Sequence, residues 1–183
     1  MIKITYDKNM LAKIEKKLGS MKKEAPKVLK NAINQTARQA RTDLKDTVKK
    51  EYTVKVGKIS QAMRISRATN SKLEATIWIS GKPLNITNYK TTAPKKGAKA
   101  QIVKTGGALK VIVGSMGIKA FKGMNGLIWQ RRTEERYPIK PLKSPSIPKV
   151  VSNKKRVYGI VKPKIQKNLK ENVNKQIRRV LGG

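Results

Sequence analysis

The chain of 183 residues contains no cysteine and no histidine. It can therefore form no disulfide, offers no thiolate nucleophile and cannot build a Cys/His zinc site. A Ser-His-Asp triad lacks its histidine, and the sequence has neither an HExxH motif nor a GKS/T phosphate loop. We expect no enzyme here: no catalytic residue, no metal ligand and no cofactor site.

Acidic residues are also scarce, because 10 Asp and Glu stand against 44 Lys and Arg. Acid–base catalysis by carboxylates requires two acidic side chains close together. The closest such pairs in the sequence are Asp43 with Asp46 and Glu134 with Glu135. Basic residues surround both pairs, so surface ion pairing explains them better. A small basic enzyme therefore ranks only third among the hypotheses for this chain.

The resulting net charge of +34 is spread along the chain, with +8 in residues 1–51, +15 in 52–133 and +11 in 134–183. A protein with this charge attracts polyanions, which here means nucleic acid, an acidic protein surface or an anionic membrane. A lysine-rich composition can also reflect the base bias of a genome, so part of the excess need not serve a partner.

Long apolar runs and aromatic residues are missing too. No run of about 18 apolar residues occurs, and the first residues lack the apolar core of a secretory signal. We therefore expect no membrane partner and no membrane-spanning segment. Aromatic residues make up 4% of the chain, which argues against a single-strand binder that stacks bases on aromatic rings.

Apolar spacing predicts helices at both ends of the chain. Residues 8–19 have one apolar side and end at Gly19. After Pro26, a helix of roughly 25 residues has an apolar face at every third or fourth position. That face consists of Leu29, Ile33, Ala37, Ala40, Leu44 and Val48. A similar spacing from Val157 to Leu181 predicts a C-terminal amphipathic helix, which Gly159 and Pro163 should kink or delay. Its narrow apolar stripe favours packing on protein over lying on a membrane.

The middle of the chain is typical of strands. Residues 2–4, 64–68 and 73–80 alternate in polarity, and a short helix fits residues 56–63. Residues 101–104 and 109–113 flank Gly106-Gly107 and predict a hairpin, while 118–132 predicts another strand pair. Residues 90–100 are small, polar and cationic, so we expect an exposed, mobile loop. Four prolines make residues 137–148 extended and exclude them from the middle of a sheet.

These elements predict an α+β fold. A long N-terminal helix packs on a mainly antiparallel β-sheet, with a C-terminal amphipathic helical arm. The expected division is a body of residues 1–145 and an arm of residues 146–183.

Two groups of basic residues are candidates for contact with nucleic acid or an acidic partner. Arg38, Arg41 and Lys45 lie on the polar face of the long helix, where they can follow phosphates or serve as an ordinary solvated surface. Lys95, Lys96 and Lys99 lie in the expected loop. No recognition helix or zinc finger is present, so any DNA contact should involve the backbone without sequence preference.

Three blocks of sequence, in this order, resemble the minor tail protein Z family of tailed phages, also called tail-completion proteins. The first is Ala32-Ile-Asn-Gln-Thr-Ala-Arg-Gln-Ala-Arg-Thr-Asp-Leu44 with Tyr52-Thr-Val-Lys55, similar to the family's helix with an AR-x-AR-T-x-L core and the following Y-x-V-K. The second is Met63-Arg-Ile-Ser-Arg-Ala-Thr69 with Leu73-Glu-Ala-Thr-Ile77, then Ile79-Ser-Gly-Lys-Pro-Leu84, similar to the family's I-x-RA-t strand and S-G-x-p-L turn.

The third block comprises Ile128-Trp-Gln-Arg131, Arg136-Tyr-Pro-Ile139 and Ser144-Pro-Ser-Ile-Pro148. It is similar to the family's V-F-x-R, R-x-P-I and G-P-S-V-P motifs. Two positions depart from that pattern, because Trp129 stands where Phe is usual and Ser144 where Gly is expected. The resemblance spans residues of about 30–150.

The resemblance implies a structural virion protein at the head-proximal end of the phage tail, assembled in the bacterial host cytoplasm. It implies a six-fold ring of identical subunits, other tail and neck proteins as partners, and DNA passing through the ring. We expect the subunit or tail interface to involve residues of the third block: Trp129, Arg131, Arg136, Pro138, Ile139, Pro145, Ile147 and Pro148. The alternative is a free basic nucleic-acid-binding module that contacts the phosphate backbone without sequence specificity.

Overall fold

The computed structural model describes residues 1–114 and 116–182. The chain forms two compact units built from interleaved segments. Unit 1 consists of Met1–Lys45, Met63–Ile79 and Lys154–Gly183, and unit 2 of Asp46–Ala62 and Ser80–Asn153. Neither unit coincides with the expected segments 1–145 and 146–183, so that division stays a prediction.

Unit 1 is built on three helices and one sheet. The helices are α1 (Lys8–Leu18), α2 (Ala25–Glu51, in unit 1 up to Lys45) and α5 (Gly159–Val180). A 3₁₀ segment, Gly19–Glu24, joins α1 to α2, and Gly19 is the C-cap of α1 as predicted. Asp7 caps the start of α1, where its side chain accepts a hydrogen bond from the Asn9 backbone.

Helix α2 is the predicted long helix, and its predicted apolar face is confirmed. All six positions of that face, from Leu29 to Val48, are 0% exposed. Val28, Ala32 and Thr36 are buried as well, so at about 100° per residue the buried stripe covers roughly half of the circumference. A stripe that wide indicates a helix covered on more than one side.

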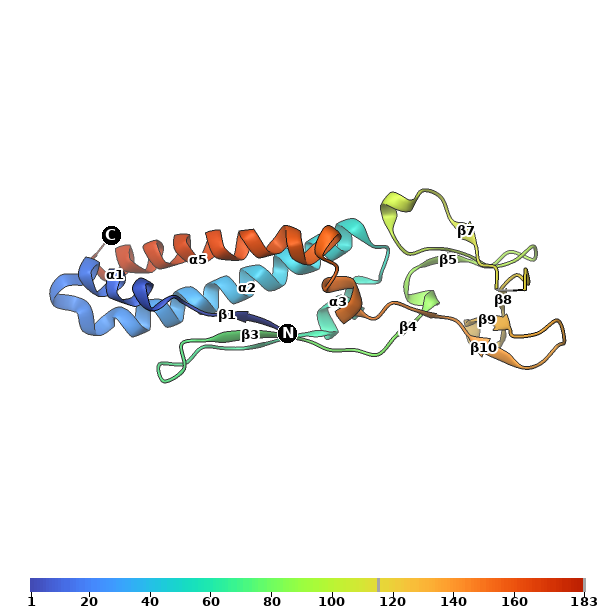
Figure 1. Ribbon diagram of the computed structural model, residues 1–183, viewed down its shortest axis with the longest axis horizontal. Helices are drawn as coiled ribbons and strands as arrows, with labels where there is room; N and C mark the ends of the chain where they lie inside the picture. The colour runs from blue at the N-terminus through green and yellow to red at the C-terminus, as the bar shows by residue number, and fades with distance from the viewer. Residues whose placement is uncertain (115, 183) are drawn as a thin grey trace. The chain divides into compact units, whose positions relative to one another are not determined.

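Helix α5 packs against the part of α2 that belongs to unit 1. Figure 1 shows the two helices side by side, running in opposite directions. The predicted stripe of α5 is buried at Val161, Ile165, Leu169, Val173 and Ile177, whereas Leu181 is exposed. The polar side chains of Asn172 and Gln176 also face α2 and are buried. The amphipathic C-terminal helix is therefore packed within unit 1.

The expected disturbance near Gly159 takes the form of a wide helical turn. Lys154–Tyr158 is a π-helix that leads directly into α5, which contains Pro163. Pro163 lies in the second turn of α5, where its missing N–H leaves the Gly159 carbonyl without its usual helical donor. The wide turn brings the Lys154 carbonyl oxygen against Gly159, where a Cβ would lie only 2.2 Å from it.

The sheet of unit 1 has the order β1-β3-β2, with both pairings antiparallel. Its strands are β1 (Ile2–Ile4), β2 (Met63–Ser66) and β3 (Ala75–Ile79). Ile2 pairs with Ile77, and Ile65 pairs with Ile77 from the other side. Buried Ile77 therefore lies at the centre of the sheet, as the predicted alternation requires.

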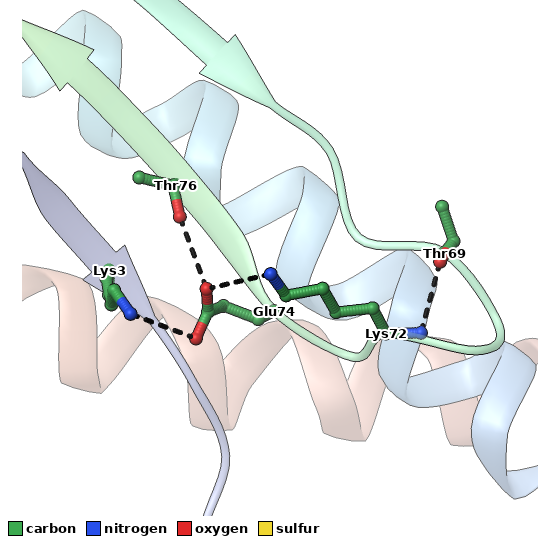
Figure 2. A network of polar contacts seen from close by, with 5 residues as sticks. All are labelled: Lys3, Thr69, Lys72, Glu74 and Thr76. Atoms are coloured by element: carbon green, nitrogen blue, oxygen red, sulfur yellow. Dashed lines mark hydrogen bonds and ion pairs between the residues drawn. The ribbon is translucent and has the colours of Figure 1, made fainter.

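Glu74, just before β3, contacts polar side chains of β1, of β3 and of the β2–β3 connection. It is the only acidic residue between positions 52 and 133. Figure 2 shows its carboxylate approached by Lys3 from β1 at 3.8 Å, by Lys72 at 3.7 Å and by the Thr76 hydroxyl at 3.5 Å. Lys72 also donates its backbone N–H to the Thr69 hydroxyl, which closes the connection between β2 and β3.

Unit 2 is built from short elements around a small core. Its helices are α3 (Val56–Gln61), which is the predicted short helix and buries Ile59, and α4 (Ile147–Val151). Its core contains Ile86, Ala98, Ala120 and Ile128. Three antiparallel sheets surround this core, with the orders β5-β6-β7, β10-β9-β8 and β11-β4.

The strands of these sheets are β4 (Leu84–Asn85), β5 (Lys90–Thr92), β6 (Lys99–Gln101), β7 (Lys110–Val111), β8 (Phe121–Lys122), β9 (Ile128–Arg131), β10 (Ile139–Pro141) and β11 (Lys143–Ser144). Short 3₁₀ turns occupy Ile86–Asn88, Lys104–Gly106 and Met124–Gly126. The α+β class is thus confirmed, with several antiparallel sheets.

The prediction of an exposed, mobile loop at residues 90–100 is wrong. Strands β5 and β6 pair across it, with Thr92 opposite Lys99, and Ala98 is 0% exposed in the core of unit 2. Gly97 permits the turn because its φ is +121° and its Cα lies against the Lys119 side chain. The hairpin predicted around Gly106-Gly107 is present, but its strands differ from the predicted ranges 101–104 and 109–113. β6 ends at Gln101, and β7, which pairs with it, begins at Lys110.

The proline block is extended, as predicted. Pro138 follows a cis peptide bond, and Pro141 ends β10, which lies at the edge of its sheet. Ser146 is the N-cap of α4, where its hydroxyl accepts a hydrogen bond from the Lys149 backbone. Pro148 lies in the first turn of α4, where a missing N–H costs nothing.

Candidate basic surface and subunit interface

The basic face of α2 is present as expected. Arg38, Arg41 and Lys45 are separated by three and four residues, so they lie on one side of the helix. Arg38 is exposed, whereas Arg41 and Lys45 are half-buried. Arg38 therefore offers the most accessible charge of the three.

Arg38 also lines a polar notch of unit 1 that has a volume of about 250 Å³. Two further arginines line it, Arg67 from the segment after β2 and Arg179 from α5. The other lining residues are amides: Asn31, Asn34, Gln35 and Gln176. We call this feature the arginine notch.

Sequence reasoning did not select Arg67 or Arg179. Arg67 is part of the quoted Ile65-Ser-Arg-Ala-Thr69 motif, which was a usable signal. Arg179 stands beside Arg178 in a helix rich in basic residues, and nothing in the sequence distinguishes the two. Their approach to Arg38 depends on how α5 and the β2–β3 connection pack on α2.

The expected lysine group belongs to unit 2. Lys95 and Lys96 are exposed at the turn between β5 and β6, while Lys99 begins β6 and is half-buried. The turn is closed by hydrogen bonds from the Gly97 N–H to the Pro94 carbonyl and from the Ala98 N–H to the Ala120 carbonyl. These lysines are presented by a hairpin with a buried base.

The expected interface residues before Pro141 are mostly accessible. Arg131, Arg136 and Pro138 are exposed, and Trp129 and Ile139 are half-buried. Trp129 on β9 lies close against Gly123, where a Cβ would be 2.4 Å from the indole ring. This contact fixes the aromatic side chain on the β8–β9 hairpin.

Arg131 and Arg136 flank Glu134-Glu135, and this spacing predicts a local ion-pair cluster. Within residues 1–114 and 116–182, no ion pair joins these groups, and all four are exposed. The two guanidinium groups lie over aromatic rings instead, Arg131 at 5.9 Å from the centre of Phe121 and Arg136 at 5.8 Å from Tyr137.

The end of the proline block is anchored from inside unit 2. The Tyr89 hydroxyl, on a side chain that is 3% exposed, donates a hydrogen bond to the Pro145 carbonyl at 3.0 Å. Burial, with a smaller contribution from Tyr52, raises the pKa of Tyr89 to about 12. Pro145 and Pro148 are half-buried.

Among the expected interface residues, Ile147 is buried, and its burial corrects the expectation that it contacts a neighbour. It is 2% exposed and is the first residue of α4. Ser146 caps α4, and the buried residues of this helix are Ile147, Val150 and Val151. Ile147 therefore has almost no surface to offer a neighbour.

The described part of the chain offers no group of three or more Asp, Glu, Cys or His residues that could hold a metal ion. Among the same residues, none of the helices has the length and apolar character needed to cross a bilayer.

Comparison with known proteins gives a family assignment. The family model described as prophage minor tail protein Z (GPZ) matches residues 11–182. The searches of curated proteins and of solved structures returned no match. The matched range contains all three blocks of sequence noted above and nearly all elements of both units. On this match, the chain belongs to the prophage minor tail protein Z family, a family of phage tail proteins.

Proposed function

We propose that this protein is a non-enzymatic tail-completion component. It forms part of a six-fold ring at the head-proximal end of a phage tail, through which DNA passes. The observation that carries the proposal is the family match over residues 11–182. The six-fold ring and its head-proximal position go beyond that match and follow from what the resemblance implies. Contact with DNA and with neighbouring proteins is supported by charge and exposure.

Charge supports an anionic neighbour. Identical subunits of net charge +34 repel each other when they are placed side by side, unless anions or acidic partners offset the repulsion. DNA in a central channel supplies such anions without any need for base recognition. The absence of a recognition helix in the sequence agrees with backbone contact alone.

Exposure supports a protein interface at the proline block. Arg131, Arg136 and Pro138 are exposed on a segment whose end is fixed by the Tyr89 hydrogen bond to Pro145. Pro138 and Pro141 reduce the backbone entropy that the segment would lose on binding. We therefore propose that this segment contacts a neighbouring subunit or another tail protein.

The interface is tested with the charge reversals Arg131→Glu and Arg136→Glu together. The matched control reverses Lys82 and Lys149, which are also exposed and give the same change in net charge. Both variants should fold, as judged by circular dichroism. Only the first should fail to enter tails when phage particles are purified and probed for this protein.

Electron microscopy of the purified protein, alone and with other tail proteins, tests the ring directly. Six-fold rings would support the proposal. Normal entry of the Arg131/Arg136 variant into infectious particles would remove the interface role. A chain that stays monomeric, binds DNA and never enters a particle would instead support the free nucleic-acid-binding module.

A further inference from the structure

The arginine notch brings three positive charges together from distant parts of the chain. Arg38 comes from α2, Arg67 from the connection after β2 and Arg179 from the last turns of α5. None of the three makes an ion pair within the residues that the structure describes, and no acidic side chain lines the notch. Three like charges repel each other there, so an anion bound between them would be stabilised.

One amide clamp holds Arg67 in place. The Asn34 side chain on α2 donates to the Ala68 carbonyl at 3.0 Å and accepts from the Ala68 N–H at 2.8 Å. The next residue, Thr69, is fixed in turn by a hydrogen bond from its N–H to the Lys72 carbonyl. The backbone beside Arg67 is thus attached to α2 before any ligand arrives.

A second amide contact positions Arg179. Gln176 on α5 is 8% exposed, and its amide N–H donates to the Gln35 side-chain oxygen at 3.2 Å. One turn earlier, buried Asn172 donates to Thr36 and Gln39 of α2. These contacts set the register between the two helices, and this register places Arg179 beside Arg38.

We infer that the arginine notch binds a phosphate group of a DNA backbone. Guanidinium groups match phosphate oxygens in a two-pronged geometry. The Gln35 oxygen is already used by Gln176, which leaves the Gln35 NH₂ group, together with the Asn31 amide, as further donors. A volume of about 250 Å³ is below that of a typical pocket for a drug-sized molecule, and it suits a single charged group of a larger ligand. This inference rests on the proposed contact with DNA and gives it a location.

The test compares two double variants of equal charge. Arg67→Gln with Arg179→Gln removes two arginines of the notch. Arg64→Gln with Arg178→Gln removes two exposed arginines from the same strand region and the same helix that do not line it. The full chain is titrated against a labelled duplex by fluorescence anisotropy at several salt concentrations.

If charge alone attracts DNA, the two variants lose affinity equally. If the notch binds phosphate, R67Q/R179Q loses on the order of tenfold more than R64Q/R178Q. The slope of log K against log salt should then also fall by about one unit more. Equal losses and equal slopes would overturn the inference.

Asn34→Ala supplies a test that removes no charge. Asn34 is a positioning residue here, so its loss should weaken duplex binding while circular dichroism stays unchanged. If Asn34→Ala disturbs folding, the arginine pairs still decide the matter.

A polyglutamate peptide serves as a second probe with the same two double variants. Selective loss of polyglutamate binding in R67Q/R179Q, with duplex binding equal to the control, would assign the notch to an acidic protein and refute the phosphate site. The outcomes also separate this inference from the proposed function. Notch-specific loss of duplex binding in a chain that forms no ring would support the phosphate site and refute the ring. A ring-forming chain with no notch-specific loss would support the ring and refute the phosphate site.

Discussion

Asn172 provides a direct test of how α5 is held on α2. Its side chain is 4% exposed and its amide N–H groups donate to the Thr36 hydroxyl at 2.9 Å and to the Gln39 side-chain oxygen at 2.8 Å. The Thr36 hydroxyl, 0% exposed, donates to the Ala32 carbonyl at 2.8 Å. A polar relay therefore crosses an otherwise apolar interface between the helices.

Asn172→Ala removes two hydrogen bonds, each worth about 1 kcal/mol net. Exposed Gln39 can regain water, whereas the lone pair on the buried Thr36 oxygen cannot. We expect unfolding free energy to fall by about 2 kcal/mol, which for a chain of this size lowers Tm by about 4–8 °C.

The matched control is Asn174→Ala on the same helix. Asn174 is exposed and accepts only a 3.4 Å hydrogen bond from Lys17, so the control reports the change in helix propensity by itself. Urea unfolding of both variants is followed at 222 nm, where the helices dominate the signal. Equal stability of the two variants would refute the view that the buried relay stabilises the helix pair.

Three further predictions concern other parts of the fold. Leu44→Ala, at a position that is 0% exposed, should lower the unfolding free energy by about 2–5 kcal/mol in urea titrations, and an effect under about 1 kcal/mol would contradict tight packing around α2. The folded-state pKa of Tyr89 is raised, so its neutral form contributes stability that is complete below pH 10 and is lost as the pH rises through about 12. Tyr89→Phe should lose the hydrogen bond to Pro145 at neutral pH but show a smaller further loss of stability over that pH range. Identical alkaline unfolding transitions in both proteins would argue against this role of Tyr89. Gly159→Ala should lower Tm although alanine favours helix, because its Cβ would meet the Lys154 carbonyl oxygen, and a raised Tm by calorimetry would show that the π-turn relaxes without cost.

The long helix could be predicted because large apolar residues repeat along it without interruption. Leu29, Ile33 and Leu44 each carry a strong hydrophobic signal, and all are fully buried. The strands β2 and β3 could be predicted similarly, from the alternating polarity of residues 64–68 and 73–80. In these elements the local pattern and the packing agree.

Small residues explain the failure at residues 90–100. Ala98 carries little apolar surface and stands among lysines, so the composition predicted a solvent-exposed segment. Ala98 instead packs in the core beside Ala120. A core built from alanines needs close backbone approach, which Gly97 permits. The sequence contains no strong marker for that kind of packing.

The arginine notch was out of reach for a different reason. Residues 38, 67 and 179 are far apart in the chain, and the amides that position two of the arginines resemble ordinary surface residues in sequence. Asn34 acts through a backbone group of Ala68, which no side-chain pattern records. Ile147 was misplaced similarly, because its direction depends on the Ser146 cap.

The interleaving of the two units has a consequence for biosynthesis. The chain passes from one unit to the other four times, and α5 follows every other element of unit 1 in chain order. During translation, the segments of unit 2 leave the ribosome before α5 does, so unit 2 can fold while the stripe on α2 still lacks its cover. Arg179 and the residues that set the register of α5 follow Arg38 and Arg67 in the chain, so the three arginines of the proposed phosphate site come together only after the segments of unit 2 have been made.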